Sequence, residues 1–491
     1  MEKGGANGGG APRRSGPPDI VLILPDQLRR DMCGCYGRPM VPTPGIDRLA
    51  EEGVVVENAV SPCPVCTPYR GMLMTGRYPT HSGVLNNFVE TNPTQNPDSL
   101  AVVLRRAGYD TAYIGKWHLS PGEYGDGGEH PSFVPPGPER LGFGHWEAYN
   151  FHMEFNNYWY YRDTAEKIYD ERYETDAVFQ LSIDLLRSRS ESASPLFLVI
   201  SPHPPHPPFG VDDAPAGYLE QVPEGIPWPP NVPSDNPRDI LAMRVYLSMV
   251  RNLDDNVAMF REYLDESRRS TSTLLIFTSD HGEMHGSHGR IHKMVPYAEA
   301  MDVPLIFRCP GTIDGGRRSE MLFGPMDYLP TLATIAGAAV PESVEGEDLS
   351  DLILDNDTVA LPPDREILTM NYSSHWNYFR SDTPETAKDW RCWPEWRGLR
   401  TKRYTYAHWL DGHQELYDNQ EDPFQLVNRI HDPAYSDIVR RHQEGMRRRM
   451  GEAHDEFLPG TAYADWFDEH RRLRRTALGL VGTREPKAPK Q

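Results

Sequence analysis

The sequence is poor in cysteine and short of positive charge. Its 6 cysteines are too few and too scattered for a disulfide scaffold, and the spacing of Cys33 and Cys35 with Cys63 and Cys66 is not common in structural zinc sites, so zinc is only an alternative. The 50 basic residues stand against 71 acidic ones, which gives a net charge of -21. This balance argues against a nucleic-acid partner, because nucleic-acid binders normally carry a basic face.

Long apolar runs are also missing. No stretch approaches the roughly 18 residues that a membrane-spanning helix needs, so we expect no membrane span. Residues 1–18 are rich in glycine and proline and lack the apolar segment of a signal peptide, so they are expected to form a flexible leader. On this basis we expect a cytoplasmic protein, or a periplasmic or secreted one if this N-terminus is incomplete.

Four short apolar runs, at residues 20–25, 111–115, 196–201 and 274–279, predict strands buried on both faces of a sheet. Because ligands of open α/β sheets bind beyond the carboxyl ends of the strands, the polar residues after these runs are predicted to converge on one crevice. The alternative is that polar residues simply end strands that reach the surface. These residues are Asp26 with Gln27, Lys116 with His118, His203 with His206, and Asp280 with His281.

The order of predicted elements indicates two parts. Helical patterns at 97–109 and 238–264 separate the predicted strands, which predicts an α/β fold with a large mixed, mostly parallel sheet between helices over residues 19–365. Short alternating segments predict a smaller C-terminal α+β subdomain with an antiparallel sheet over 366–457. Residues 458–491 include a basic stretch and are expected to form a solvated tail.

The most specific segment is CTPYRGMLMTGR at residues 66–77. It resembles the sulfatase signature, in which C-x-P-x-R followed by Leu and T-G-R marks a cysteine that a formylglycine-generating enzyme oxidises to formylglycine. The resemblance implies the alkaline-phosphatase-like superfamily, a nucleophile made from Cys66, and that maturation enzyme as a partner. The alternative chemistry is an unmodified thiolate activated by a helix N-terminus. The matching residues are Cys66, Pro68, Arg70, Leu73, Thr75, Gly76 and Arg77.

Formylglycine matters because its hydrate carries two hydroxyl groups on one carbon. One hydroxyl attacks sulfur with help from a metal, and the other expels sulfate after the alcohol has left. A serine ester would instead need a water molecule to attack a crowded sulfate.

The resemblance extends from Asp19 to about Asp432, and it implies a metal site. Many family members have a second acid where this chain has Gln27, and an asparagine where it has His281. These departures resemble the branch of choline sulfatases and phosphonate monoester hydrolases. Two carboxylates and an amide suit Ca²⁺, the expected metal, whereas an imidazole favours Mn²⁺ or Zn²⁺. The implied ligands are Asp26, Gln27, Cys66, Asp280 and His281.

The same resemblance implies which residues surround the modified cysteine. Arg70 would hold the formylglycine hydrate. In the segment GKWHL, Lys116 would contact the sulfate group and His118 would serve the modified cysteine. Together with the metal, these cations would form a local anion site in an acidic protein.

Further residues would contact the substrate by the same resemblance. His206 matches the family's sulfate-side acid, with His203 as its rival. Lys293 matches the lysine that neutralises the ester and assists departure of the alkoxide. Asn87 would contact the anion, and Asn86 is nearly as good a match. Judged without the resemblance, each of these residues could be an ordinary solvated side chain.

These residues together resemble a sulfatase that hydrolyses an alkyl, aryl or carbohydrate sulfate ester. A phosphonate monoester or phosphodiester hydrolase could use the same residues, and a non-catalytic anion- or glycan-binding homologue is a further alternative. The segment from Trp376 to Trp409 is rich in Trp and Tyr and could wall the pocket, although such residues more often form a core.

Overall fold

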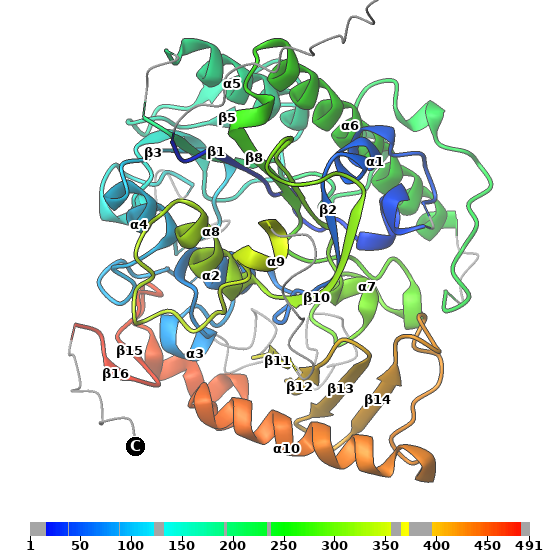
Figure 1. The fold of residues 1–491 in the computed structure, drawn as a ribbon. Helices are drawn as coiled ribbons and strands as arrows, with labels where there is room; N and C mark the ends of the chain where they lie inside the picture. Colours follow the sequence, from blue (N-terminus) through cyan, green and yellow to red (C-terminus); the bar gives the residue numbers. More distant parts are fainter. Residues whose placement is uncertain are drawn as a thin grey trace, which may run out of the picture.

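The computed structural model describes residues 16–37, 39–87, 89–121, 132–190, 194–232, 237–354, 365–372 and 395–482. Its centre is an eight-stranded sheet with the order β10-β2-β9-β8-β1-β7-β3-β4 (Figure 1). All neighbours run parallel except β9, which is antiparallel to β8 and β2. This confirms the predicted mixed, mostly parallel sheet. The strands are β1 Asp19–Ile23, β2 Val54–Ala59, β3 Asp110–Lys116, β4 His145–Tyr149, β7 Leu196–Ser201, β8 Thr273–Thr278, β9 Leu305–Arg308 and β10 Arg317–Phe323.

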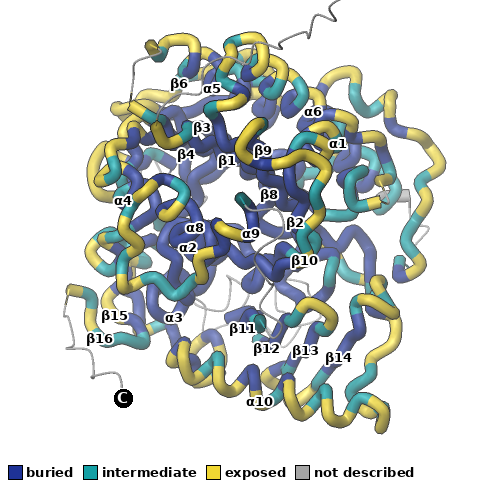
Figure 2. Tube along the Cα trace, viewed as in Figure 1, coloured by how far each residue is buried: buried dark blue, intermediate teal, exposed yellow. Residues whose placement is uncertain are grey.

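The four predicted strands are the neighbours β8, β1, β7 and β3. Every residue of β1 is buried, and its side chains alternate between two core clusters, with Ile20 and Leu22 in one and Val21 and Ile23 in the other. A strand that is covered on both faces has no position for an exposed polar residue, which explains the continuous apolar run. Figure 2 shows these strands as a buried centre with exposed segments around it.

Helices cover both faces of the sheet (Figure 1). On one face lie α1 Pro44–Glu51, α5 Glu174–Ser188 and α6 Pro237–Glu266. On the other lie α2 Cys66–Thr75, α4 Leu100–Arg106 and α8 Tyr328–Ile335. The predicted helices at 97–109 and 238–264 correspond to α4 and α6. Among the described residues, no helix is both long and apolar enough to cross a lipid bilayer.

A second sheet, antiparallel throughout, lies in the C-terminal part of the chain below the main sheet in Figure 1. Helix α10 Ser436–Glu452 packs along it. This confirms the predicted smaller part with an antiparallel sheet. Its strands, in order across the sheet, are β11 Ile367–Asn371, β12 Trp396–Arg400, β13 Tyr404–Trp409 and β14 Gln414–Asp418.

The described end of the chain is not the solvated tail that was expected. Residues 460–466 form a 3-10 helix, and β15 Arg475–Thr476 pairs with β16 Gly479–Leu480. Tyr463, Trp466 and Leu473 are buried in the core cluster of the second sheet. Removing these large apolar side chains from water outweighs the cost of holding the basic segment beside them. Residues 1–15 and 483–491 lie outside the described residues.

The Trp- and Tyr-rich segment is described only in part. Residues 376–394 lie outside the described residues. Trp396 and Trp409 are buried in the core cluster that includes the second sheet. Trp396 and Trp409 are therefore core, whereas Tyr404 lines a cavity of about 680 Å³ that contains none of the predicted site residues.

Candidate functional site

The polar residues that follow the four central strands lie together at one edge of the main sheet. Because these strands are adjacent and parallel, their carboxyl ends share that edge. Lys116 Nζ, at the end of β3, donates to Asp26 Oδ2 after β1 at 2.6 Å and lies 2.9 Å from His203 Nε2 after β7. Asp280 Oδ1, after β8, accepts from the Gln27 N–H at 3.0 Å. The four clusters therefore converge, as predicted.

Helix α2 carries Cys66 to this edge. The helix begins at Cys66, so its side chain projects from the first turn. The N–H of Thr67, which has no partner within the helix, donates to Asn87 Oδ1 at 2.9 Å, and Thr67 Oγ1 donates to the carbonyl of His118 at 2.7 Å. The helix ends at Thr75 and is followed by Gly76, whose φ of 64° lies in the left-handed region that glycine readily adopts. Asn87 thus orients the first turn that holds Cys66.

Four potential metal ligands meet around Cys66. The ligand atoms of Asp26, Cys66, Asp280 and His281 all lie within 4.8 Å of one another, and all four residues are buried. Cys66 Sγ is 3.7 Å from Asp26 Oδ1 and 3.2 Å from His281 Nε2. The Nδ1–H of His281 donates to the carbonyl of Gly282 at 3.0 Å, so Nε2 presents its lone pair to the cluster.

The charges of this cluster fit a divalent cation. Burial raises the pKa of Asp280 to about 6, and the negative charge of Asp26 adds to the rise. Burial also disfavours ionisation of Asp26, but the positive groups around it, Lys116 first among them, hold its pKa well below the usual range. Two crowded carboxylates and an imidazole nitrogen suit a hard or borderline divalent metal, whose charge would relieve their repulsion. The residues present therefore fit the metal that the resemblance implies.

Gln27, the fifth predicted ligand, makes other contacts in this structure. Its Nε2 donates to Glu283 Oε2, and its Oε1 accepts from Lys293 Nζ. Its backbone φ of 69° lies in the left-handed region, which non-glycine residues rarely adopt. Its role as a ligand stays a prediction.

Arg70 connects the strand ends through a fully buried guanidinium group. Its Nε donates to Asp280 Oδ2 at 3.0 Å and its Nη2 to Asp26 Oδ2 at 3.3 Å. Its Nη1 donates to Ser201 Oγ at 2.8 Å and to the carbonyl of Lys116 at 3.0 Å. The burial disfavours its charge, yet Asp280 and other neighbours raise its pKa above the usual value. Arg70 therefore stays charged and fixes both carboxylates.

The position of Lys116 depends on how closely the end of β3 approaches β7. Gly115 precedes it with a φ of 104°, and a Cβ there would lie 2.2 Å from the carbonyl oxygen of Ser201, so only glycine fits. The Nδ1–H of His203 donates to the carbonyl of His152 at 2.7 Å, which leaves Nε2 to accept from Lys116. Burial and the charge of Lys116 lower the pKa of His203 well below its usual value.

His206 and Lys293 lie nearer the surface than the metal cluster. Their exposed fractions are 8% and 7%, against 0% for Asp26. Burial and the charges of Lys293 and Lys116 lower the pKa of His206 well below its usual value. Its Nδ1–H donates to the carbonyl of Pro207 at 2.6 Å, so its Nε2 is left to face the site. His206 also groups with Asp26 and His203, and the choice between the two histidines stays a prediction.

His118 and the two asparagines lie beside α2. Burial and the charge of Lys116 lower the pKa of His118 well below its usual value, and its ring lies 4.6 Å from the ring of Phe151. Asn86 Oδ1 accepts from the N–H of Asn87 at 2.8 Å. The contact of either asparagine with an anion stays a prediction.

The alternative zinc site has no support among the described residues. Cys33 lies in the core cluster with α1 and α6, whereas Cys63 lies in the cluster with the second sheet. Burial raises the pKa of the Cys33 thiol well above its usual value, and raises that of Cys35 and that of Cys63 to about 12. Cys33, Cys35 and Cys63 thus share no site with Cys66.

Three residues that support the site were not predicted. Ser201 holds Arg70, Glu174 Oε1 accepts from the N–H of His203 at 2.8 Å, and Glu283 binds the Gln27 amide. Glu283 could have been found, because it follows Asp280 and His281 in the same motif. Ser201 and Glu174 have no such motif around them.

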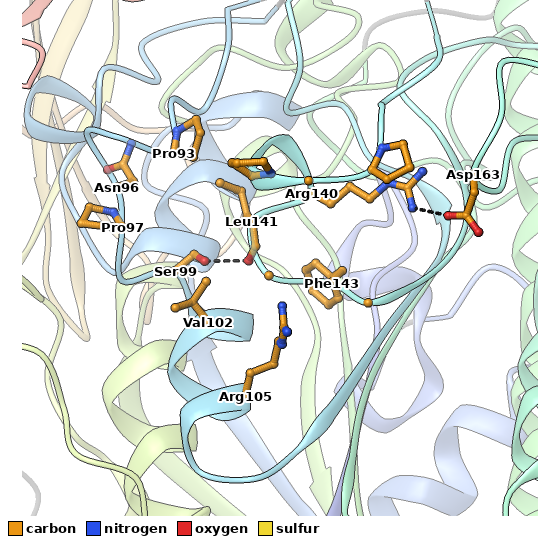
Figure 3. Close-up of a pocket in the computed structure, with 15 residues that line it drawn as sticks. Pro93, Asn96, Pro97, Ser99, Val102, Arg105, Arg140, Leu141, Phe143 and Asp163 are labelled. Atoms are coloured by element: carbon orange, nitrogen blue, oxygen red, sulfur yellow. Dashed lines mark hydrogen bonds and ion pairs between the residues drawn. The ribbon is translucent and has the colours of Figure 1, made fainter.

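A separate cavity of about 520 Å³ lies between α4 and the segment before β4 (Figure 3). Its wall is mainly proline, glycine and apolar residues, with Arg105 as an exposed cation. Two contacts fix it: Ser99 Oγ donates to the carbonyl of Leu141 at 2.7 Å, and Arg140 pairs with Asp163 at 2.9 Å. None of the predicted site residues lines this cavity.

Comparison with known proteins identifies the family. A family model described as Sulfatase matches residues 18–338, and one described as N-sulphoglucosamine sulphohydrolase, C-terminal, matches residues 286–452. An Ulvan-active sulfatase of Formosa agariphila is 33% identical over 90% of this chain and 82% of its own length. An N-acetylglucosamine-6-O-sulfatase of Bacteroides thetaiotaomicron is 23% identical over 84% of this chain and 82% of its own. The crystal structure of yidJ from Bacteroides fragilis aligns with a TM-score of 0.78 and 28% identity, over 91% of this chain and 98% of that chain.

The first match alone spans well over half of the chain, and the Formosa relative is similar along almost all of it. The aligned regions contain the cluster around Cys66 as well as the central strands. The chain therefore belongs to the sulfatase family, the sulfuric ester hydrolases with an alkaline-phosphatase-like fold.

Proposed function

We propose that the protein hydrolyses a carbohydrate sulfate ester, using a formylglycine hydrate made from Cys66 and a divalent cation. One observation carries the proposal: Cys66 Sγ is buried among Asp26, Asp280 and His281, and two of the surrounding groups are the cations of Arg70 and Lys116. An ordinary structural cysteine has no need of such neighbours.

The ligands of the cation would be Asp26, Asp280 and His281 together with residue 66, with Ca²⁺ as the expected metal and Mn²⁺ or Zn²⁺ as alternatives. When bound, the metal would withdraw charge from a hydroxyl group of residue 66 and make it a better nucleophile. Arg70 would orient this residue, because it already fixes both carboxylates from one side.

The remaining side chains would bind and neutralise the ester. Lys116 and Lys293 carry positive charge toward a tetrahedral anion, in a site whose other bases are neutral. His118, His203 and His206 are neutral because burial lowers the pKa of each. A buried, water-poor site with fixed cations stabilises charge that develops in the transition state better than water does. Lys293, near the surface, is the group we assign to the departing alkoxide.

The substrate class rests on the relatives. One is named for a sulfate of N-acetylglucosamine, and the C-terminal family model is named for N-sulphoglucosamine. Alkyl and aryl sulfates share the ester group and would serve as simpler substrates.

A phosphonate monoester or phosphodiester hydrolase is the second candidate. Asp26 followed by Gln27, and Asp280 followed by His281, resemble the branch that contains both choline sulfatases and phosphonate monoester hydrolases, so they do not separate the two activities. Parallel measurement of kcat/KM on an aryl sulfate and an aryl phosphonate distinguishes the two. A large preference for the phosphonate would overturn the choice of sulfate.

The first experiment measures the modification itself. Protein produced with a formylglycine-generating enzyme is digested with trypsin, and the peptide of residues 49–70 is sequenced by mass spectrometry. We expect residue 66 to be about 18 Da lighter than cysteine and Cys63, in the same peptide, to remain a thiol that can be alkylated. Full sulfatase activity in protein with an unmodified Cys66 would contradict the proposal.

A further inference from the structure

The segment that presents Lys293 has an unusual backbone. Residues 284–292 fold back on themselves, with the Met284 N–H donating to the carbonyl of His292 and the Gly286 N–H to that of Arg290, both at 2.7 Å. Four non-glycine residues between 285 and 294 have positive φ, which L-amino acids adopt only at a cost in energy. They are His285 at 42°, His288 at 53°, His292 at 65° and Met294 at 75°. Such a segment needs contacts from outside to keep its shape.

Glu283 supplies these contacts from the base of the segment. Its side chain is almost fully buried, with 2% exposed. Its Oε1 accepts from the N–H of His285 at 3.2 Å and from the N–H of His292, which lie at the two ends of the turn. A single carboxylate oxygen therefore joins the two sides immediately before Lys293.

The second oxygen of Glu283 sets the orientation of an amide. Oε2 accepts from Gln27 Nε2, and Gln27 Oε1 accepts from Lys293 Nζ. A carboxylate only accepts hydrogen bonds and an ammonium group only donates them, whereas an amide does each at one end. With Glu283 ionised, the amide of Gln27 has one favourable orientation, in which its oxygen faces Lys293.

We infer that Glu283 is a positioning residue for the reaction: it fixes the loop of residues 284–292 and the amide of Gln27, and so holds the Lys293 ammonium group where the leaving oxygen departs. The inference rests on the proposed function, in which Lys293 neutralises the departing alkoxide. Glu283 does not touch the substrate in this account, and acts only through Gln27 and Lys293.

A purely structural role for Glu283 makes a different prediction. If it only stabilises the loop, its loss should lower the rate for every substrate by the same factor. If it positions Lys293, the loss should depend on the leaving group, because a basic alkoxide needs neutralisation and a stable aryloxide needs much less.

The test measures kcat/KM of the metal-loaded, formylglycine-containing enzyme on a sugar or alkyl sulfate and on a series of aryl sulfates of decreasing leaving-group pKa. We expect Glu283→Gln to lower kcat/KM by about 10- to 100-fold on the alkyl sulfate, the factor for one lost charge-assisted contact, and by less than about threefold on the most activated aryl sulfate. Lys293→Met should show the same steeper dependence. Combined with Glu283→Gln, it should lose little more than Lys293→Met alone.

Glu299→Gln is the matched control. Glu299 is also buried, with 7% exposed, and accepts from Asn231 Nδ2 at 2.5 Å. We expect this variant to change kcat/KM equally for all leaving groups. An equal loss across the series in Glu283→Gln, or full additivity with Lys293→Met, would overturn the inference.

If Glu283→Gln does not fold, Gln27→Met carries the same test, because it removes the amide and leaves both backbone contacts of Glu283 in place. Its metal content is measured alongside, and the same steeper leaving-group dependence is expected at unchanged metal content. An unchanged dependence would again overturn the inference. A wild-type enzyme that hydrolyses no sulfate ester would instead contradict the proposed function, so the two failures are distinguishable.

Discussion

Two buried arginines show how differently this protein uses charge in its two parts. Arg397, in β12, faces one carboxylate, that of Asp455, through contacts of 2.5 and 3.1 Å. Arg70, in α2, faces the two carboxylates of Asp26 and Asp280 at 3.3 and 3.0 Å. Both guanidinium groups are shielded from solvent. In the first pair one guanidinium group meets one carboxylate. In the second group one guanidinium group is shared between two carboxylates.

The comparison teaches how to tell a structural ion pair from a functional one. Arg397 also packs 4.1 Å from the ring of Tyr372, and its carboxylate partner needs no further cation. Near Arg70, burial and a like charge raise the pKa of Asp280 to about 6, an arrangement that costs stability unless something else binds. Strongly shifted carboxylates in contact with a potential nucleophile are typical of active sites.

Removing the proposed nucleophile should have the largest effect, and it tests whether the group around Arg70 is functional. We expect Cys66→Ala to lower kcat/KM on a sulfate ester by at least about 10⁴-fold, because the proposed covalent step takes place on residue 66. The substitution removes one small atom, so the free energy of unfolding should change by only about 1 kcal/mol. Steady-state kinetics and urea unfolding measure the two effects.

Cys63→Ala is the control for this variant. Cys63 is equally buried, three residues earlier, and lies in the core cluster of the second sheet. Its loss should leave kcat/KM within about threefold of wild type. Near-normal turnover by Cys66→Ala would show that the nucleophile lies elsewhere.

Removing the proposed divalent cation should have the next largest effect. After dialysis against a chelator we expect kcat to fall by about 10² to 10³-fold and Ca²⁺ to restore it, because the hydroxyl group of residue 66 would no longer be activated by the metal. Ca²⁺ should also raise the unfolding temperature of the metal-free protein, since it would bind the folded state only. Full activity in protein shown to be metal-free by elemental analysis would contradict the metal site. Asp280→Asn should abolish the stabilisation by Ca²⁺.

Removing one partner of the ion pair between Arg397 and Asp455 should lower stability and leave the catalytic rate almost unchanged. We expect Arg397→Met to lower the free energy of unfolding by about 3–5 kcal/mol, because Asp455 would be left as a buried charge without its partner. The double variant Arg397→Met with Asp455→Leu should recover most of this loss. The folded fraction of each variant should keep kcat within about threefold. A loss of activity in stable, folded protein would show that this pair also serves the site.

The central strands and the cluster around Cys66 could be predicted for separate reasons. Strands β1, β3, β7 and β8 are buried on both faces over nearly all of their length, so their middle residues are mainly apolar. The edge strand β10 has alternating partly exposed residues at its start, Arg317 to Glu320, and it gave no such run. The Cys66 motif, Asp26 with Gln27, and Asp280 with His281 each lie within one short segment, so they could be recognised in the sequence.

Contacts between distant segments could not be predicted. Gln27 and Glu283 are 256 residues apart, and Arg397 and Asp455 are 58 apart; nothing in the sequence indicates that the members of either pair meet. The prediction of a solvated C-terminal tail was wrong for a related reason. Its basic residues suggested solvent, whereas Trp466 and Leu473 are covered by a core cluster that only the folded chain creates.

Glu174 gives the prediction with the smallest expected effect. It is a buried carboxylate near the site, but no arginine or lysine pairs with it in the described contacts. It is fully buried beside His203, accepts from the hydroxyl of Tyr149, and its Oε2 has no hydrogen-bond partner among the described residues. Burial raises its pKa from 4.5 to about 7. Between these values the folded protein binds one proton more than the unfolded chain, so this contribution to stability is complete below about pH 4.5 and is lost as the pH rises through 7.

We expect Glu174→Gln to remove this loss, because glutamine resembles the protonated acid and can still accept from Tyr149 and from His203. The variant should match wild type below about pH 4.5 and exceed its stability at pH 8 by about 3 kcal/mol. Urea unfolding at several pH values measures the difference, in which the other titrating groups cancel because both proteins share them. If the difference in stability between the variant and wild type does not change between pH 5 and 8, Glu174 is ionised in the folded state. It would then be a further buried negative charge, like the two carboxylates near Arg70.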